Sequence, residues 1–276
     1  MADDKEADNT ERPWQGRLVA AGLGTGLAEL SAGWQRRVWS RRAANWHRHP
    51  PTGLAGVTSA VIGAAAVRPG EAVVDLGCGT GQVSIPLALR GAEVLAVDVS
   101  PAMTDLLRAE ARSRGLTSLT VVTLPAERLV LPPASVDLVV TSYALHHVRD
   151  ADKARLVRAA YCWLRPGGRL VIADMMLGRG GSARDREIIR AKLGALARKG
   201  PGGWWRIAKN VVRYLLRIQE RPISMAAWSG LLETAGFTTV AASSIVAEAG
   251  LVTGRRPAAP ADAVAARTRE AAAGHV

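Results

Sequence analysis

The sequence is poor in several residue types and patterns, and each shortage excludes a class of protein. Its 276 residues contain only two cysteines, Cys78 and Cys162, which rules out a disulfide framework and favours a reducing compartment. Residues 1–12 are polar and charge-mixed, so they lack the apolar stretch of a signal peptide. The apolar segment 18–32 is too short to span a bilayer and contains Glu29. We therefore expect a cytoplasmic protein.

Aromatic residues are scarce except for tryptophan, since one Phe and three Tyr stand against eight Trp. Six of the tryptophans lie outside the predicted sheet: Trp14, Trp34, Trp39, Trp46, Trp204 and Trp205. The formal charge of +12 is also uneven, because residues 30–49 carry +5, residues 178–222 carry +9 and the remainder carries −2. Clustered cations attract acidic surfaces or ligands, so an anionic partner for the two basic segments remains possible.

Apolar runs alternate with helical patterns along the middle of the chain, which predicts an α/β fold with a doubly wound, largely parallel sheet. The strands are expected near residues 71–76, 93–98, 119–123, 136–142, 169–174, 238–246 and 250–255. The helices are expected near residues 54–67, 80–90, 101–114 and 151–164.

The organisation that we predict has four parts. Residues 1–15 form a disordered tail, residues 16–53 a helical segment rich in Trp and Arg, and residues 258–276 a flexible tail. The main domain covers residues 54–257. It includes an insertion at 178–225, which is too long for an ordinary connection.

The stretch Val73-Val-Asp-Leu-Gly-Cys-Gly-Thr-Gly81 carries the strongest functional signal. It indicates a buried strand that breaks into a glycine turn, where the backbone can take positive φ and a ligand can approach bare amides. A second acid, Asp98, ends the next apolar run, which is where an acid can hold a ribose diol. The spacing Asp-x-Gly-x-Gly-x-Gly differs from the dinucleotide-binding Gly-x-Gly-x-x-Gly.

This glycine pattern resembles motif I of the class I S-adenosylmethionine (SAM) dependent methyltransferases. Three further segments, 137–148, 164–174 and 235–237, resemble the family's fourth strand, its Pro-Gly-Gly turn with the fifth strand, and the turn into the last hairpin. The resemblance covers about residues 54–177 and 226–256. It implies a Rossmann-like sheet of seven strands, mostly parallel with an antiparallel last hairpin, and SAM as the cofactor.

The resemblance also implies roles for individual residues around the cofactor. Asp75 would organise the methionine end, Asp98 would hold the ribose hydroxyls, and Val99 and Met103 would lie against adenine. The full set that we predict to bind the cofactor is Asp75, Gly77, Cys78, Gly79, Gly81, Asp98, Val99, Met103, Ala126, Glu127, Ser142 and Tyr143. The family often has Asp where this chain has Pro125, so adenine must be read by Ala126, Glu127 or a carbonyl.

Methyl transfer to a hydroxyl or amine needs a base, and His146 after the fourth strand with Asp174 at the end of the fifth resembles the His/Asp pair of small-molecule O-methyltransferases. We predict His146 as general base beside Asp174, with no metal; the alternative is that His146 only lines the pocket. The expected partner is a small, bulky, partly apolar acceptor, and no nucleic acid. A non-catalytic SAM-binding module is the weaker alternative.

Within the insertion, residues 204–219 place apolar side chains on one helical face and Arg or Asn on the other. This pattern predicts an amphipathic lid helix. It also leaves open a helix at a membrane surface, in which case the acceptor would be a lipid or a quinone.

Overall fold

The computed structural model describes residues 19–20, 26–49, 53–178, 182–198, 220–246 and 248–258. The lid helix predicted at 204–219 lies outside the described residues, and so do the predicted tails apart from residue 258.

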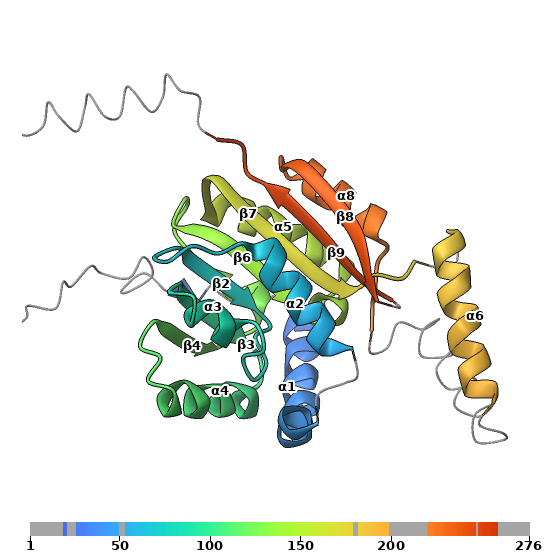
Figure 1. Cartoon of the computed structure of the whole chain (residues 1–276), viewed down its shortest axis with the longest axis horizontal. Helices are drawn as coiled ribbons and strands as arrows, with labels where there is room; N and C mark the ends of the chain where they lie inside the picture. Colours follow the sequence, from blue (N-terminus) through green and yellow to red (C-terminus); the bar gives the residue numbers. More distant parts are fainter. Residues whose placement is uncertain are drawn as a thin grey trace, which may run out of the picture.

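A seven-stranded sheet forms the centre of the molecule (Figure 1). Its strands are β2 (Ala72–Leu76), β3 (Glu93–Asp98), β4 (Leu119–Thr123), β6 (Val136–Ser142), β7 (Leu164–Met175), β8 (Thr238–Val246) and β9 (Ala249–Arg255). The strand order is β4-β3-β2-β6-β7-β9-β8, and β9 alone runs against its neighbours. The chain reverses its winding direction between β2 and β6, and open α/β sheets bind ligands at the carboxyl edge of such a point.

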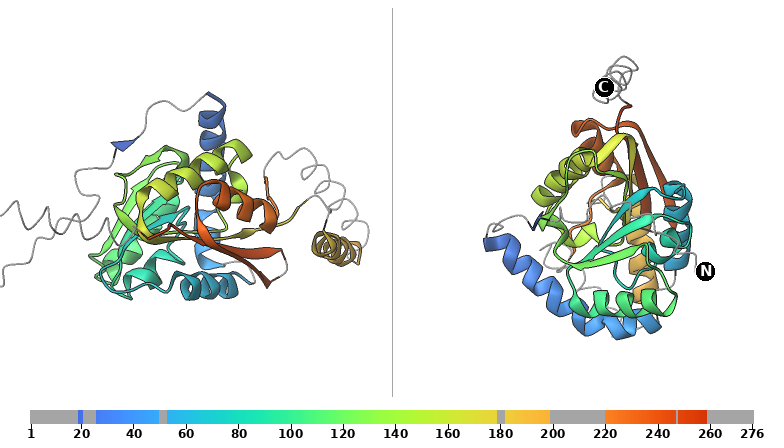
Figure 2. Two further views of the ribbon diagram at one scale, coloured as in Figure 1. Left: turned by 90° about the horizontal axis from the view of Figure 1, so that it is seen from above. Right: turned by 90° about the vertical axis from the view of Figure 1, so that its left-hand side faces the viewer.

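Helices cover both faces of the sheet (Figure 2). The described α-helices are α1 (Gly26–Arg48), α2 (Leu54–Ala65), α3 (Ser84–Ala88), α4 (Pro101–Ser113), α5 (Asp150–Trp163), α6 (Ala183–Ala197) and α8 (Met225–Thr234). One apolar core joins α5 and α8 to the sheet, and a second joins α2, α3 and α4 to the opposite face. All five residues of β2 are buried because neighbouring side chains enter the two cores in turn.

The predicted strands and helices are confirmed, with the same bounds for four strands. Strand β7 begins at Leu164, five residues before the predicted 169, and α6 was not predicted. Helix α3 is shorter than the predicted 80–90, because turns occupy residues 79–83 and the helix begins only at Ser84. Within the segment predicted as helical at 16–53, residues 26–48 form the continuous helix α1. The segment also contains a short strand that we did not predict, β1 (Val19–Ala20), which pairs antiparallel with β5 (Leu129–Val130). A two-residue strand is too short to show a period-2 pattern.

Helix α1 lies alongside α4, near the edge of the sheet where the glycine turn sits (Figure 2). Two hydrogen bonds fix it there. The side-chain amide of Gln35 donates to the His147 carbonyl at 2.9 Å, and the hydroxyls of Ser40 and Ser100 lie 3.0 Å apart. Helix α1 therefore lies over the edge of the sheet where the glycine turn sits.

Helix α6 begins close to the end of β7. The guanidinium of Arg184 donates to the Met176 carbonyl at 2.7 Å, and Asp185 accepts from the Gly178 amide at 2.9 Å. None of the helices in the described part of the chain is long and apolar enough to cross a membrane.

Candidate functional site

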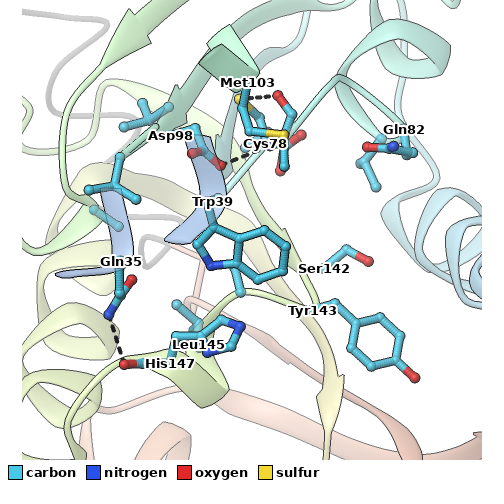
Figure 3. A pocket seen from close by; sticks show the side chains of 18 of the residues that line it. Gln35, Trp39, Cys78, Gln82, Asp98, Met103, Ser142, Tyr143, Leu145 and His147 are labelled. Atoms are coloured by element: carbon cyan, nitrogen blue, oxygen red, sulfur yellow. Dashed lines mark hydrogen bonds between the residues drawn. The ribbon is translucent and has the colours of Figure 1, made fainter. Parts of the chain in front are cut away.

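A pocket opens at the carboxyl ends of β2, β3 and β6 (Figure 3). Its wall contains every residue that the sequence predicted for cofactor binding except Gly81. The structure therefore brings together side chains that are up to 68 positions apart in the chain, from Asp75 to Tyr143. Their meeting at one edge follows from the parallel sheet, because the carboxyl ends of parallel strands lie on the same side.

The glycine turn makes more bonds within the protein than the sequence suggested. The amides of Gly77 and Cys78 both donate to the Val97 carbonyl, at 2.8 and 3.0 Å, and the amide of Gly79 donates to Asp98 Oδ2 at 3.0 Å. The expectation of bare amides in this turn is therefore wrong for these three residues. What the turn offers a ligand is close approach of the backbone.

Gly77 is required by its backbone and by its neighbour. Its φ is +73°, which lies in the left-handed region, and an added Cβ would collide with the Cβ of Ala144. The same contact brings the end of β2 against the segment after β6, so the two halves of the pocket meet at this glycine.

We expect Gly77→Ala to lower the free energy of unfolding by roughly 2–4 kcal/mol, since a left-handed alanine costs about 1 and overpacking 1–3. Urea denaturation measures this loss. Gly70→Ala is the matched control, because Gly70 has φ +81° and a Cβ added there would meet nothing within 4 Å. Equal losses in the two variants would show that close packing at Gly77 is unimportant.

Gly81 does not line the pocket, which corrects its predicted role as a cofactor contact. A Cβ at this position would collide with Leu107 of α4 and with Ile85 of α3. The glycine is therefore needed for packing of the helices behind the turn and for its φ of +94°. Sequence spacing alone cannot distinguish a glycine that contacts the cofactor from one that is needed for packing, because both roles require glycine.

Asp75 is buried at the floor of the pocket, with 1% of its surface exposed. Burial raises its pKa to about 7, against the lowering effect of the Ser84 hydroxyl, which donates to Oδ2 at 2.5 Å; the nearby charge of Asp98 raises it further. Near neutral pH this acid therefore exchanges between a neutral and a charged form. A bound ammonium group would favour the charged form.

This shift predicts a pH dependence of cofactor binding. If Asp75 holds the ammonium of the methionine end, as the resemblance implies, only its ionised form attracts that group, so SAM affinity should rise up to about tenfold per unit as pH increases toward 7. Above that value the gain should level off. Calorimetric titrations between pH 5.5 and 7.5 measure the effect, and Asp75→Asn should flatten the curve. A flat curve in the native chain would contradict a charge-dependent role for Asp75.

Asp98 is partly buried at the tip of β3, and both of its oxygens accept backbone amides. Oδ2 binds the Gly79 amide at 3.0 Å and Oδ1 binds the Ser100 amide at 2.8 Å. Burial raises its pKa, and these hydrogen bonds oppose that rise. Because each carboxylate oxygen has two acceptor positions, this arrangement orients the carboxylate and still leaves it able to accept two hydroxyls.

The predicted catalytic pair is in contact. His146 Nδ1 lies 2.5 Å from Asp174 Oδ1, and the His146 amide donates to Asp174 Oδ2 at 2.8 Å. Burial lowers the pKa of His146, but the charge of Asp174 and its hydrogen bond more than compensate, so the pKa lies above its ordinary value. A carboxylate accepts the Nδ1 proton, which leaves Nε2 as the basic nitrogen of a neutral ring.

Neither member of this pair lines the pocket; the neighbouring Leu145 and His147 do. The ring centroids of His146 and His147 are 3.9 Å apart, so His146 lies directly behind the pocket wall. The role of His146 as a base stays a prediction.

Sequence reasoning missed the contribution of α1 to the pocket. Gln35, Trp39 and Trp46 reach into it, and the ring of His147 contacts that of Trp39. A signal was present, because residues 35, 39 and 46 recur at spacings of four and seven, which place them on one helical face. Trp34 lies off this face and is 37% exposed.

Cys78 also lies in the wall of the pocket but behaves as a small apolar residue. Burial raises the pKa of its thiol well above the ordinary value, so the thiol stays protonated and is a poor nucleophile.

Comparison with known proteins agrees with this geometry. Residues 73–168 match the model of the methyltransferase domain family. An uncharacterised methyltransferase of Synechocystis is 31% identical over 164 residues, which is 59% of this chain and 63% of that protein. A ubiquinone/menaquinone biosynthesis C-methyltransferase of Serratia proteamaculans is 29% identical over 65% of this chain and 71% of its own length. An uncharacterised methyltransferase of Mycobacterium bovis is 42% identical, but over only 36% of this chain and 37% of that protein.

Solved structures support the fold. The 1,6-didemethyltoxoflavin-N1-methyltransferase of Burkholderia thailandensis superposes with a TM-score of 0.59 at 16% identity, over 87% of this chain and 95% of that one. The chain spans less than two thirds of the length of the Synechocystis and Mycobacterium relatives. The strand order, the site at the switch point and these matches lead to one conclusion: residues 73–168 are similar to a methyltransferase domain, and the chain has the fold of solved methyltransferases.

Proposed function

We propose that the protein transfers a methyl group from SAM to a hydroxyl or amine of a small acceptor, with His146 as general base. The observation that carries this proposal is the conjunction of a pocket floored by Asp75 and Asp98 with a His146–Asp174 pair directly behind its wall. The acids suit the cofactor, and the pair suits proton removal from an acceptor.

The residues in the pocket fit SAM. The glycine turn brings backbone close to the floor, Asp75 is placed for a cationic group, and Asp98 is held for a diol. When bound, SAM supplies an electrophilic methyl group on a sulfonium centre, which leaves as a neutral thioether. Ala126 and Glu127 line the pocket, which is consistent with the adenine contacts that we predict in place of the family's Asp.

The remaining chemistry belongs to the side chains. Asp174 accepts the Nδ1 proton of His146 and fixes the tautomer, so that Nε2 can take the proton of the acceptor as the methyl arrives. Helix α1 covers the pocket and limits the access of water. Because His146 lies behind His147, the acceptor has to reach past the wall of η2 (Leu145–His147) or His146 has to turn toward it.

The test is turnover. The full chain is incubated with SAM carrying a labelled methyl group and with small-molecule cell extract, and products are separated by mass. The proposal predicts S-adenosylhomocysteine together with a labelled hydroxyl- or amine-derived product. Cofactor binding without turnover, with extracts from several growth conditions, would instead support a SAM-binding module.

A second candidate is methylation of a quinone or lipid at a membrane surface. It is favoured by the similarity to the Serratia proteamaculans C-methyltransferase, which acts in ubiquinone and menaquinone biosynthesis. Co-sedimentation with anionic vesicles distinguishes it, because surface binding by basic segments should weaken as salt increases. Carbon-linked label in a quinone product would replace the first candidate by this one.

A further inference from the structure

The pocket wall that faces the glycine turn is aromatic. It consists of Trp39 and Trp46 from α1, Tyr143 after β6, and His147 of η2. Figure 3 shows Trp39 in the middle of the cavity, with Cys78 and Asp98 on one side and His147 on the other. The chain has few aromatic residues, so four rings at one cavity form a distinct apolar surface. This surface faces the glycine turn, where the cofactor is proposed to bind.

The rings hold one another at steep angles. The centroids of Trp39 and His147 are 5.3 Å apart with planes at 67°, and those of Trp39 and Trp46 are 5.4 Å apart at 87°. Such edge-to-face contacts fix the plane of Trp39 without a parallel ring lying on it. The Gln35 bond to the His147 carbonyl holds the same two elements together, so the orientation of Trp39 is set before any ligand arrives.

The charge of the pocket is acidic. Three of its described lining residues are carboxylic acids, Asp75, Asp98 and Glu127, and none is Lys or Arg. The guanidinium of Arg42 lies 5.8 Å from the Trp39 ring centre but is not part of the wall. An anionic acceptor would therefore find no cationic side chain among the described lining residues, and burying it without such a partner is costly. The two basic segments made an anionic partner possible, but the described lining of this cavity does not suit an anionic acceptor.

We propose that the methyl acceptor is an uncharged planar ring compound that stacks on Trp39. This inference rests on the proposed methyl transfer and names its substrate class. The aromatic wall provides the contact for a flat ring, and the absence of cations among the described lining residues selects against carboxylated or phosphorylated acceptors.

Three probes of nearly equal size test the proposal: 2-naphthol, the saturated alcohol decahydro-2-naphthol, and 2-naphthoate. Their affinities are measured by calorimetry at neutral pH with the full chain saturated with S-adenosylhomocysteine. We expect 2-naphthol to bind about tenfold more tightly than either of the others, which is the size of one aromatic stack. Equal affinity for the saturated alcohol, tighter binding of 2-naphthoate, or no binding of 2-naphthol would overturn the proposal.

Variants separate stacking from a merely structural role of Trp39. The readout is the affinity ratio of 2-naphthol to decahydro-2-naphthol, which general loosening of α1 would leave unchanged. Trp39→Ala should bring this ratio close to one, Trp39→Phe should keep most of it, and Trp34→Ala should keep all of it, because Trp34 is exposed on the same helix. An unchanged ratio in Trp39→Ala would reject the stacking contact.

A separate titration with S-adenosylhomocysteine distinguishes failure of the proposed function from failure of the proposed acceptor class. A native chain that does not bind it contradicts the proposed function, and the three probes then test the ring site in the cofactor-free chain. A chain that binds it but does not discriminate among the probes contradicts only the acceptor class.

Discussion

His146→Ala is expected to lower kcat roughly 10²–10⁴-fold while leaving the affinity for SAM nearly intact. In the proposed mechanism Asp174 holds Nδ1 and the remaining ring nitrogen serves as base. Only the neutral ring accepts a proton, so kcat should also rise with pH through a pKa above the ordinary 6.5. Asp174→Asn should act in the same direction and more weakly if the acid only orients the ring. Steady-state rates at saturating SAM measure both effects.

Two control variants make this result specific. His47→Ala changes an exposed histidine at the end of α1 and should leave kcat unchanged. His147→Ala changes the histidine that lines the pocket and is expected to alter acceptor affinity more than kcat. If His147→Ala abolished turnover and His146→Ala did not, the base would be His147 and the buried pair would have a structural role.

Asp98→Ala is expected to weaken SAM binding by about 2–3 kcal/mol, or roughly 30- to 150-fold, because charge-assisted hydrogen bonds to the ribose hydroxyls are lost. The structure adds a second consequence. The amides of Gly79 and Ser100 lose their acceptor, so the free energy of unfolding should also fall by about 1–3 kcal/mol.

Calorimetry and urea denaturation measure these two losses separately. Asp98→Asn keeps the shape and one acceptor oxygen, so it should recover part of both. Asp105→Ala is the matched control, since Asp105 lies on the neighbouring helix α4 with a side chain that is 70% exposed. Native SAM affinity in a folded Asp98→Ala chain would remove this residue from the cofactor site.

The sheet and the meeting of two acids at the floor of the pocket could be predicted because their signals are local. The run 93–98 is apolar over most of its length, as a parallel strand buried on both faces must be, and it ends at an acid. Asp75 and Asp98 follow at the carboxyl ends of neighbouring strands. Once the strands are known to be parallel, these two acids must meet at one edge.

The other half of the pocket depends on contacts that no local pattern contains. Gln35 and His147 are 112 positions apart. The spacing of residues 35, 39 and 46 places them on one helical face, but nothing near either residue indicates that this face crosses the site. The choice between His146 and His147 is similar. They lie in a 3-10 helix, where successive side chains point about 120° apart, so the two rings cannot face the same way. Which of them faces the pocket depends on the contact of His146 with Asp174 and of His147 with α1.

A methyltransferase site in this pocket can be tested by the rate of S-adenosylhomocysteine formation as a function of SAM concentration, measured for the native chain, Asp98→Ala and His146→Ala with one extract as acceptor source. We expect that Asp98→Ala regains much of the native rate at high SAM, whereas His146→Ala stays slow at every concentration. No S-adenosylhomocysteine from the folded native chain, or native rates in both variants, would contradict a SAM-dependent methyltransferase site in this pocket.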